Sequence, residues 1–186
     1  MQIVIGSKFY AKQKNSPDSE ELSAIARGEI SLRQRAIRLL AGRERSRAEL
    51  VKKLAAYGTT EEISAVLDEL TELGLLSDQR YAASYVRSQA ARLGRSRLAH
   101  SLRAKGIATD LAAETLTSQL NSSVDNDEFH RATALWARKF DKVPSDAKEW
   151  AKQARFLQYR GFSSEVIRRI LRDAKAAANE SGEVSA

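Results

Sequence analysis

The chain has 186 residues, 42% of them hydrophobic, and a formal net charge of +7 at pH 7, which favours a polyanionic partner or an acidic protein surface. It contains no cysteine, so disulfides, a thiolate nucleophile and thiolate metal ligands are excluded. Its apolar opening at residues 3–5 is far shorter than a secretory signal core or the ~20 residues of a membrane span. We therefore expect a soluble, cytoplasmic protein without a membrane partner.

The first 30 residues show no sustained hydrophobic period and include Gly6, Asn15 and Pro17. This composition predicts a loosely ordered, variable N-terminal segment, residues 1–30, in which a short strand at residues 2–5 is the one regular element we expect.

Residues 31–76 predict a first repeat of three helices, because apolar residues recur there at helical spacing between polar capping residues and glycines. The predicted N-caps are Ser31, Ser46 and Thr60. Glu49 stands three residues after Ser46 and predicts a capping box with it. The glycines expected to end the helices are Gly42, Gly58 and Gly74.

Residues 77–120 predict a second repeat of the same kind. Ser77 or Asp78 is the expected N-cap of its first helix, which ends around Gly94. The second helix ends at Gly106, and Thr109 or Asp110 caps the third.

Residues 121–178 predict the third repeat. It opens with the polar, turn-rich run 121–127, the best hinge candidate, and its final helix is expected from Ser163 or Ser164 to about Ala177, before a flexible tail at residues 179–186. This repeat is rich in aromatic residues, and their helical spacing favours core packing over base stacking: Phe129, Trp136, Phe140, Trp150, Phe156, Tyr159 and Phe162.

One helical pattern is written three times in the chain. Its three copies are Leu50, Leu54 and Gly58; Leu98, Leu102 and Gly106; and Gln153, Leu157 and Gly161. Each copy closes on a glycine, where a positive φ can end a helix, and repetition at this length is typical of a repeat array. The sequence thus predicts an all-α protein built from three tandem helical repeats of about three helices each.

Charge alternates in phase with the first two repeats. Residues 31–57 carry eight Lys or Arg and two Glu, whereas residues 58–80 carry six acidic residues and one Arg. Residues 86–105 then carry six Lys or Arg and no acid, and residues 106–130 carry five acids and no Lys or Arg. The charge of any single helix could simply belong to a solvated face that a neighbouring helix neutralises. Because two successive repeats show the same order of basic and acidic segments, we favour a basic stripe along the surface.

No pattern in the chain indicates catalysis. The two histidines, His100 and His130, lie in no metal-ligand motif, and there is no phosphate-binding glycine loop and no nucleophile elbow. We expect no enzyme activity, no cofactor, no metal site and no small-molecule substrate.

Several short motifs follow one another over residues 31–172. They are Arg45-Ser46, Glu49-Leu50, Lys53-Leu54, the block from Leu70 through Leu73-Gly74-Leu75-Leu76-Ser77-Asp78 to Arg80-Tyr81-Ala82, the run Leu102-Arg103-Ala104-Lys105-Gly106-Ile107, and Arg160-Gly161-Phe162. These motifs, in this order, resemble the RecX family of recombination regulators. The family more often has Asp where Ser77 stands, a mild departure because Ser caps a helix as well.

The resemblance implies three tandem three-helix repeats in an elongated, curved array. It also implies a non-enzymatic regulator that binds the RecA recombinase in the groove of its filament on DNA and restrains strand exchange, ATP hydrolysis and coprotease activity. Single- or double-stranded DNA is a further candidate partner.

Charge and helical phase select the candidate contact residues for the filament or DNA. They are Arg35, Arg38, Arg43, Arg45, Arg47, Lys52, Arg87, Arg92, Arg95, Arg97, Arg103, Lys105, Arg168, Arg169 and Arg172. We call these fifteen residues the basic set.

Two other interpretations remain open. Residues 46–73 could form a helix-turn-helix DNA-binding module, although the helix that would enter the major groove is acidic: Glu61, Glu62, Asp68, Glu69 and Glu72. A purely structural scaffold is the third interpretation, and it leaves the phased charges without an explanation.

Overall fold

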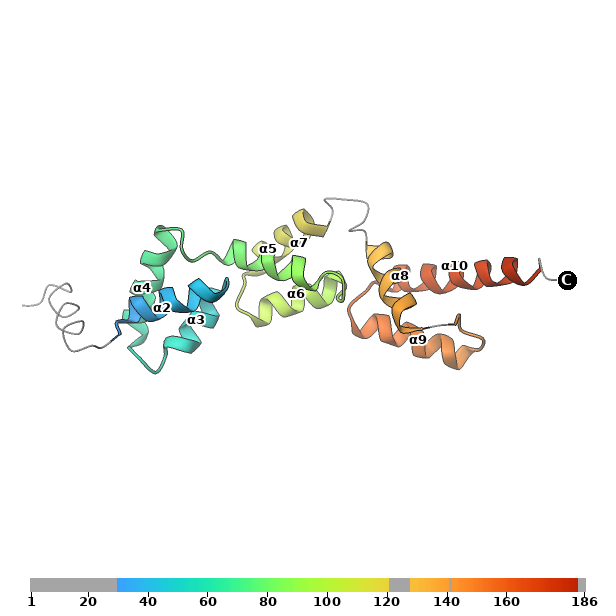
Figure 1. Ribbon diagram of the computed structural model, residues 1–186, viewed down its shortest axis with the longest axis horizontal. Coiled ribbons are helices and arrows are strands. Elements are labelled where there is room, and N and C mark those ends of the chain that lie inside the picture. Colours follow the sequence, from blue (N-terminus) through green and yellow to red (C-terminus); the bar gives the residue numbers. More distant parts are fainter. Residues whose placement is uncertain (1–29, 121–127, 141, 184–186) are drawn as a thin grey trace, which may run out of the picture.

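The computed structural model describes residues 30–120, 128–140 and 142–183. Within these ranges the chain forms nine α-helices and no strand, as the sequence predicts, and they lie in three clusters along one elongated, curved array (Figure 1). The strand expected at residues 2–5 and the hinge expected at residues 121–127 lie outside the described residues.

The first repeat consists of α2 (Leu32–Gly42), α3 (Arg47–Leu54) and α4 (Thr60–Glu72). Ser31 and Ser46 are N-caps, as predicted, but the N-cap of α4 is Thr59 and not Thr60. Thr59 is the N-cap because Glu62 stands three residues after it. The two residues form a capping box in which each side chain accepts a hydrogen bond from the other's backbone.

The second repeat consists of α5 (Asp78–Gln89), α6 (Arg95–Ala104) and α7 (Thr109–Leu120). Of the two predicted candidates, Ser77 is the N-cap of α5, and Asp78 is the first residue of the helix. Gly94 has a different role from the expected one, because it is the N-cap of α6 and α5 already ends at Gln89. Thr109 is the first residue of α7, so it does not precede the helix as a cap.

The third repeat consists of α8 (Glu128–Lys139), α9 (Ala147–Tyr159) and α10 (Ser164–Glu183). The Ser163 hydroxyl accepts a hydrogen bond from the Val166 backbone at 3.3 Å, which confirms the expected start of the last helix. That helix runs past the expected end at Ala177 to Glu183.

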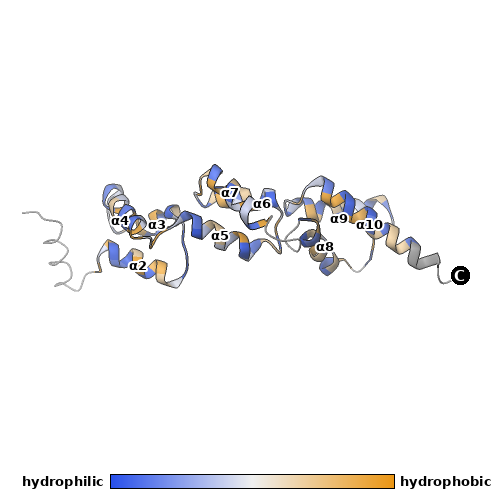
Figure 2. Cartoon of the chain, turned by 90° about the horizontal axis from the view of Figure 1, so that it is seen from above, coloured by the Kyte–Doolittle hydropathy of each residue, from blue (hydrophilic) through white to orange (hydrophobic). Residues whose placement is uncertain are grey.

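Each repeat has its own hydrophobic core, built from the apolar stripes of its three helices (Figure 2). The predicted repeat leucines lie in these cores, and all five are fully buried: Leu50, Leu54, Leu98, Leu102 and Leu157. Most aromatic residues of the third repeat also pack in its core, as expected, but Tyr159 is 79% exposed and Trp150 is 40% exposed.

The three glycines of the repeated pattern are not equivalent. Gly106 and Gly161 have φ of +81° and +85°, as predicted, whereas Gly58 has no positive φ and α3 ends before it at Leu54. A Cβ on Gly106 would lie 2.3 Å from the Ala48 Cβ, and one on Gly161 would lie 2.5 Å from Arg97. Both glycines thus touch the second helix of the preceding repeat, a contact for which Gly58 has no counterpart in the described residues.

Candidate functional site

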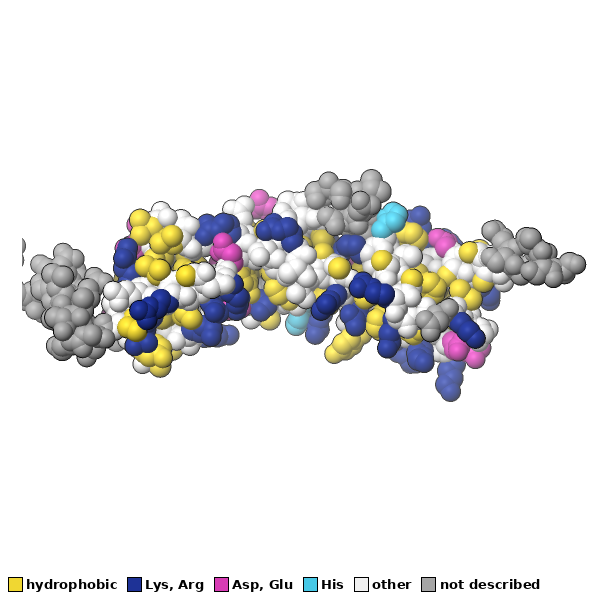
Figure 3. Space-filling view, in the orientation of Figure 1, with side chains coloured by type: hydrophobic (Ala, Val, Ile, Leu, Met, Phe, Trp, Pro, Cys, Tyr) yellow, Lys and Arg dark blue, Asp and Glu magenta, His cyan; other side chains and the backbone are white. Residues whose placement is uncertain are grey.

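The candidate site is a surface. Lys and Arg side chains gather along the lower edge of the molecule on all three repeats, where few acidic side chains appear (Figure 3). Four members of the basic set are exposed with no side-chain hydrogen bond, ion pair or ring contact among the described residues: Arg38, Lys52, Arg92 and Arg103. These four cations are available to a partner.

Other exposed members of the basic set are lightly held. Arg87 donates to Gln119 at 3.1 Å, and Arg97 lies 5.7 Å from the ring centre of the exposed Tyr159. In α10, Arg168 donates to the Ser164 carbonyl of its own helix, and Arg172 pairs with Asp173. Exposed contacts of this kind contribute little to stability, so these side chains can turn to a partner at low cost. Arg169 is held more firmly, because it pairs with Asp173 and its guanidinium also lies 4.1 Å from the ring centre of Phe129.

A third group within the basic set is held inside the first repeat. Arg35 lies 4.0 Å from the ring centre of Tyr57, and Arg45 donates to the Leu39 carbonyl at 2.8 Å. Arg47 forms an ion pair with Asp68 at 2.9 Å. Helical phase alone gave no sign of these contacts.

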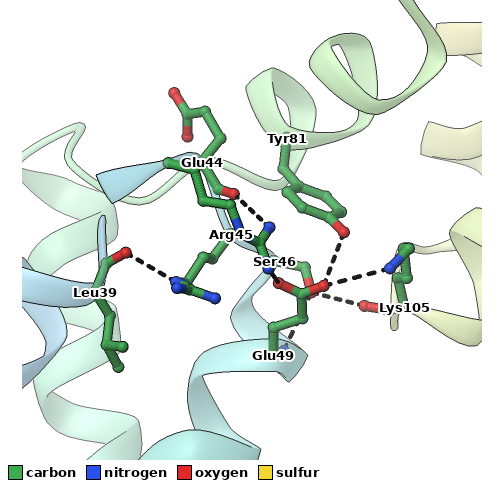
Figure 4. A network of polar contacts seen from close by, with 8 residues as sticks. Leu39, Glu44, Arg45, Ser46, Glu49, Tyr81 and Lys105 are labelled. Carbon is green, nitrogen blue, oxygen red and sulfur yellow. Dashed lines mark hydrogen bonds and ion pairs between the residues drawn. The ribbon is translucent and has the colours of Figure 1, made fainter. Parts of the chain in front are cut away.

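The first junction, where the start of α3 meets the second repeat, is a polar network around Glu49 (Figure 4). The Glu49 carboxylate accepts a hydrogen bond from the Tyr81 hydroxyl at 2.9 Å, and it pairs with Lys105 at 3.4 Å and Arg43 at 3.0 Å. The fully buried Ser46 hydroxyl donates to the Lys105 carbonyl at 2.7 Å. Two members of the basic set, Arg43 and Lys105, therefore take part in this network, although the Arg43 side chain is still 53% exposed.

The capping box expected from Ser46 and Glu49 is only half present. Ser46 accepts a hydrogen bond from the Glu49 backbone at 3.1 Å, but the Glu49 side chain turns to Tyr81 and Lys105. Two partners from the next repeat bind the carboxylate more strongly than one backbone N–H would.

The network shifts the pKa of its members. Burial raises the pKa of the Glu49 carboxyl, but the Tyr81 hydrogen bond and the charges of Arg43 and Lys105 outweigh it, and that pKa lies below its ordinary value. Burial and the neighbouring Glu49 raise the pKa of the Tyr81 hydroxyl. Burial lowers the pKa of Lys105, but Tyr81 and Glu49 outweigh it, so the Lys105 pKa is raised and the ammonium is kept charged.

The second junction, where the start of α6 meets the third repeat, has the same geometry with different chemistry. The Gly94 N–H donates to the Arg160 carbonyl at 2.9 Å, and the Ser96 hydroxyl donates to the Gly161 carbonyl at 3.0 Å. Arg131 is 7% exposed, and its guanidinium donates to the carbonyls of Ala90 at 2.8 Å and Leu93 at 3.2 Å.

Sequence reasoning missed Arg131. A signal exists, since Arg131 adjoins the buried Ala132 on the apolar side of α8, but a buried arginine is rare and an arginine is normally read as a surface residue.

The described part of the chain holds no group of three or more His, Cys, Asp or Glu side chains placed to bind a metal ion, and both His100 and His130 are exposed. None of its helices combines the length and the apolar character that crossing a bilayer requires. Fold and surface together define a class: an all-α repeat protein that presents an elongated basic face.

Comparisons with known proteins name the family within that class. Models of the first, second and third three-helix domains of RecX match residues 33–70, 77–116 and 126–171. The chain is 46% identical to "Regulatory protein RecX" of Leptothrix cholodnii over 150 residues, which are 80% of this chain and 92% of that protein. It is 40% identical to "Regulatory protein RecX" of Ralstonia nicotianae over 86% of this chain and 98% of that protein.

Solved structures agree in fold. The crystal structure of RecX from Lactobacillus salivarius matches with a TM-score of 0.66 at 24% identity, over 78% of this chain and 95% of that one. A crystal structure of regulatory protein RecX matches with a TM-score of 0.64 at 25% identity, over 90% and 82%. The chain belongs to the RecX family of regulatory proteins.

Proposed function

We propose that this protein is a non-enzymatic, cytoplasmic regulator that binds the RecA recombinase filament on DNA and inhibits strand exchange, ATP hydrolysis and coprotease activity. Membership of the RecX family supports the recombinase as partner. The observation that carries the proposal is the set of exposed basic side chains along an array whose repeats are joined by polar contacts at two junctions. Repeats joined in this way lose less conformational entropy on binding an extended partner than repeats on flexible linkers would.

The chemistry of the exposed cations fits a filament on DNA. A nucleoprotein filament presents phosphates and acidic side chains along its length, and an extended basic face can pair with both. Arg38 and Lys52 lie on the first repeat, and Arg92 and Arg103 on the second, so no single repeat carries the whole face. Direct contact with single- or double-stranded DNA is part of the same proposal.

The helix-turn-helix alternative finds less support. The helix that would enter the major groove is α4, and Glu61, Glu62, Asp68, Glu69 and Glu72 are all exposed on it. Phosphates on both sides of the groove would repel these carboxylates.

A titration of the DNA-dependent ATPase activity of RecA tests the proposal. Wild-type protein should lower the rate at substoichiometric amounts, and a Lys52→Glu/Arg92→Glu variant should be weaker by about tenfold or more, because two exposed cations become repulsive. The matched control is Lys148→Glu/Lys175→Glu, which changes the net charge equally at exposed residues outside the basic set. An unchanged ATPase rate at saturating wild-type protein would contradict inhibition.

A further inference from the structure

An apolar groove lies at the second junction, between α6, α7 and the turn that leads into α10. Its volume is about 450 Å³, and the buried side chains of Leu116 and Phe162 form its floor. Its walls carry the short side chains of Ala99, Ala112 and Ala113. Because alanine occupies these positions, the helices leave a space that admits a large apolar side chain.

Charge at the groove is positive and partly unpaired. The charged residues that line it are Arg95, Arg103 and Glu128. Arg95 donates to the Thr117 hydroxyl at 2.8 Å, and the Glu128 carboxylate accepts a hydrogen bond from the Arg95 backbone at 3.1 Å. The Arg103 side chain is exposed and has no hydrogen bond or ion pair in the described part of the chain. An acidic group of a bound molecule could therefore form an ion pair with Arg103.

At the equivalent position of the first repeat, polar side chains occupy the space of the groove. Equivalent residues of the two repeats are 48 positions apart in the sequence, as Gly58 and Gly106 are. In the first repeat, the Arg47 side chain crosses to Ser64 at 3.0 Å and to Asp68 at 2.9 Å. The equivalents of these three residues in the second repeat are Arg95, Ala112 and Leu116. The groove is thus a feature of the second repeat and not of the shared scaffold.

We propose that this groove binds a segment of the recombinase in which an apolar side chain stands beside an acidic residue. The apolar side chain rests on Leu116 and Phe162, and the carboxylate pairs with Arg103. The inference rests on the proposed function, because it names the part of the partner that the second repeat recognises. Charge complementarity favours an acidic protein segment over DNA, since an apolar floor offers nothing to a phosphate backbone.

Photo-crosslinking on RecA filaments tests the inference. Full-length protein with p-benzoylphenylalanine at position 113 is irradiated with RecA filaments on single-stranded DNA, and the same probe at position 65 serves as the control. Ala65 is the exposed equivalent of Ala113 in the first repeat, where the Arg47 side chain crosses to Ser64 and Asp68. We expect an adduct with RecA from position 113 only, on a peptide that holds Asp or Glu beside a large apolar residue.

Two substitutions add an independent measurement. Ala113→Trp should obstruct the groove and Arg103→Glu should repel the acidic residue. Each should raise the protein concentration needed to inhibit the RecA ATPase by roughly tenfold, the loss of one anchoring contact. The matched controls, Ala65→Trp and Lys53→Glu, should leave inhibition unchanged. Circular dichroism and thermal melting check that all four variants fold.

The outcomes separate this inference from the proposed function. If wild-type protein inhibits the ATPase but the probe at position 113 reacts only with DNA, with a second copy of this chain or with nothing, the groove inference is wrong and the proposed function stands. Equal effects of the groove variants and their controls would overturn it as well. If wild-type protein neither inhibits nor binds RecA filaments, the proposed function fails and takes the groove inference with it.

Discussion

The two junctions between repeats share a geometry and differ in what holds them. At each, the start of a repeat's second helix meets the end of the next repeat's second helix, and the contacts involve Gly106 at the first junction and Gly161 at the second. The first is closed by charged side chains around Glu49, the second by backbone contacts and the buried Arg131. Hence a common scaffold tolerates different chemistry, and the two junctions should respond differently to substitution, pH and salt.

The largest effect is expected at the second junction from Gly94→Ala. The added Cβ would lie 2.3 Å from the Gly161 carbonyl oxygen, and backbone cannot move aside as a flexible side chain can. We expect a loss of about 2–4 kcal/mol in the free energy of unfolding, measured by urea titration. Gly42→Ala is the control, since nothing lies within 4 Å of its added Cβ. Equal stability of both variants would contradict the close contact between Gly94 and the Gly161 backbone.

Arg131→Met should come next. It keeps the apolar stem but leaves the carbonyls of Ala90 and Leu93 without their charged donor. We expect a loss of about 2–3 kcal/mol by thermal or urea unfolding. Arg138→Met on the exposed side of the same helix should change stability by less than about 0.5 kcal/mol. An equally small loss of stability for Arg131→Met would contradict a stabilising role of Arg131 at this junction.

Glu49→Gln tests the first junction, with an expected loss of about 1–2 kcal/mol at pH 7. The folded-state pKa of Glu49 is lowered, so the carboxylate stabilises the fold above the unfolded-state pKa, and this contribution disappears as the pH falls through the folded-state value. Stability of wild-type protein should therefore fall more steeply than that of Glu49→Gln below about pH 5. Parallel pH profiles from pH 7 to pH 2 would contradict the network.

The smallest effect is expected from an ion pair inside the first repeat. Arg33 and Glu69 meet at 2.9 Å, but both side chains are more than 40% exposed. Glu69→Gln should cost less than about 0.5 kcal/mol, and the cost should vanish at high salt. A loss of stability as large as that from Glu49→Gln would contradict the idea that the partly buried pairs of the junction are stronger than exposed surface pairs.

Much of the fold could be predicted from the sequence because it depends on local patterns. Leucines at helical spacing, Ser N-caps and the glycines at 74, 106 and 161 specify helices and their ends, and the structure has them. The N-cap of α4 also has a local signal, because Glu62 stands three residues after Thr59 and not after Thr60. Gly94 has none, because glycine is favourable both before a helix and after one, and its role is decided by a hydrogen bond to the distant Arg160 carbonyl.

The candidate surface was less predictable for a related reason. Arg43 and Lys105 look like any exposed cation in the sequence, and only tertiary structure brings both to Glu49. Several residues that carry the family resemblance meet at this junction, among them Ser46, Glu49 and Tyr81, yet they are separated by up to 35 residues in the chain. Long-range pairs of this kind leave no periodic signal.

Cosedimentation with RecA filaments tests the central claim, that an extended basic face of this protein binds the filament. Wild-type protein should sediment with RecA filaments on single-stranded DNA at moderate salt, should be released as salt rises, and should bind more weakly when Lys52→Glu and Arg92→Glu are combined. Protein that stays in the supernatant with filaments, or that binds DNA without RecA equally well, would contradict the claim.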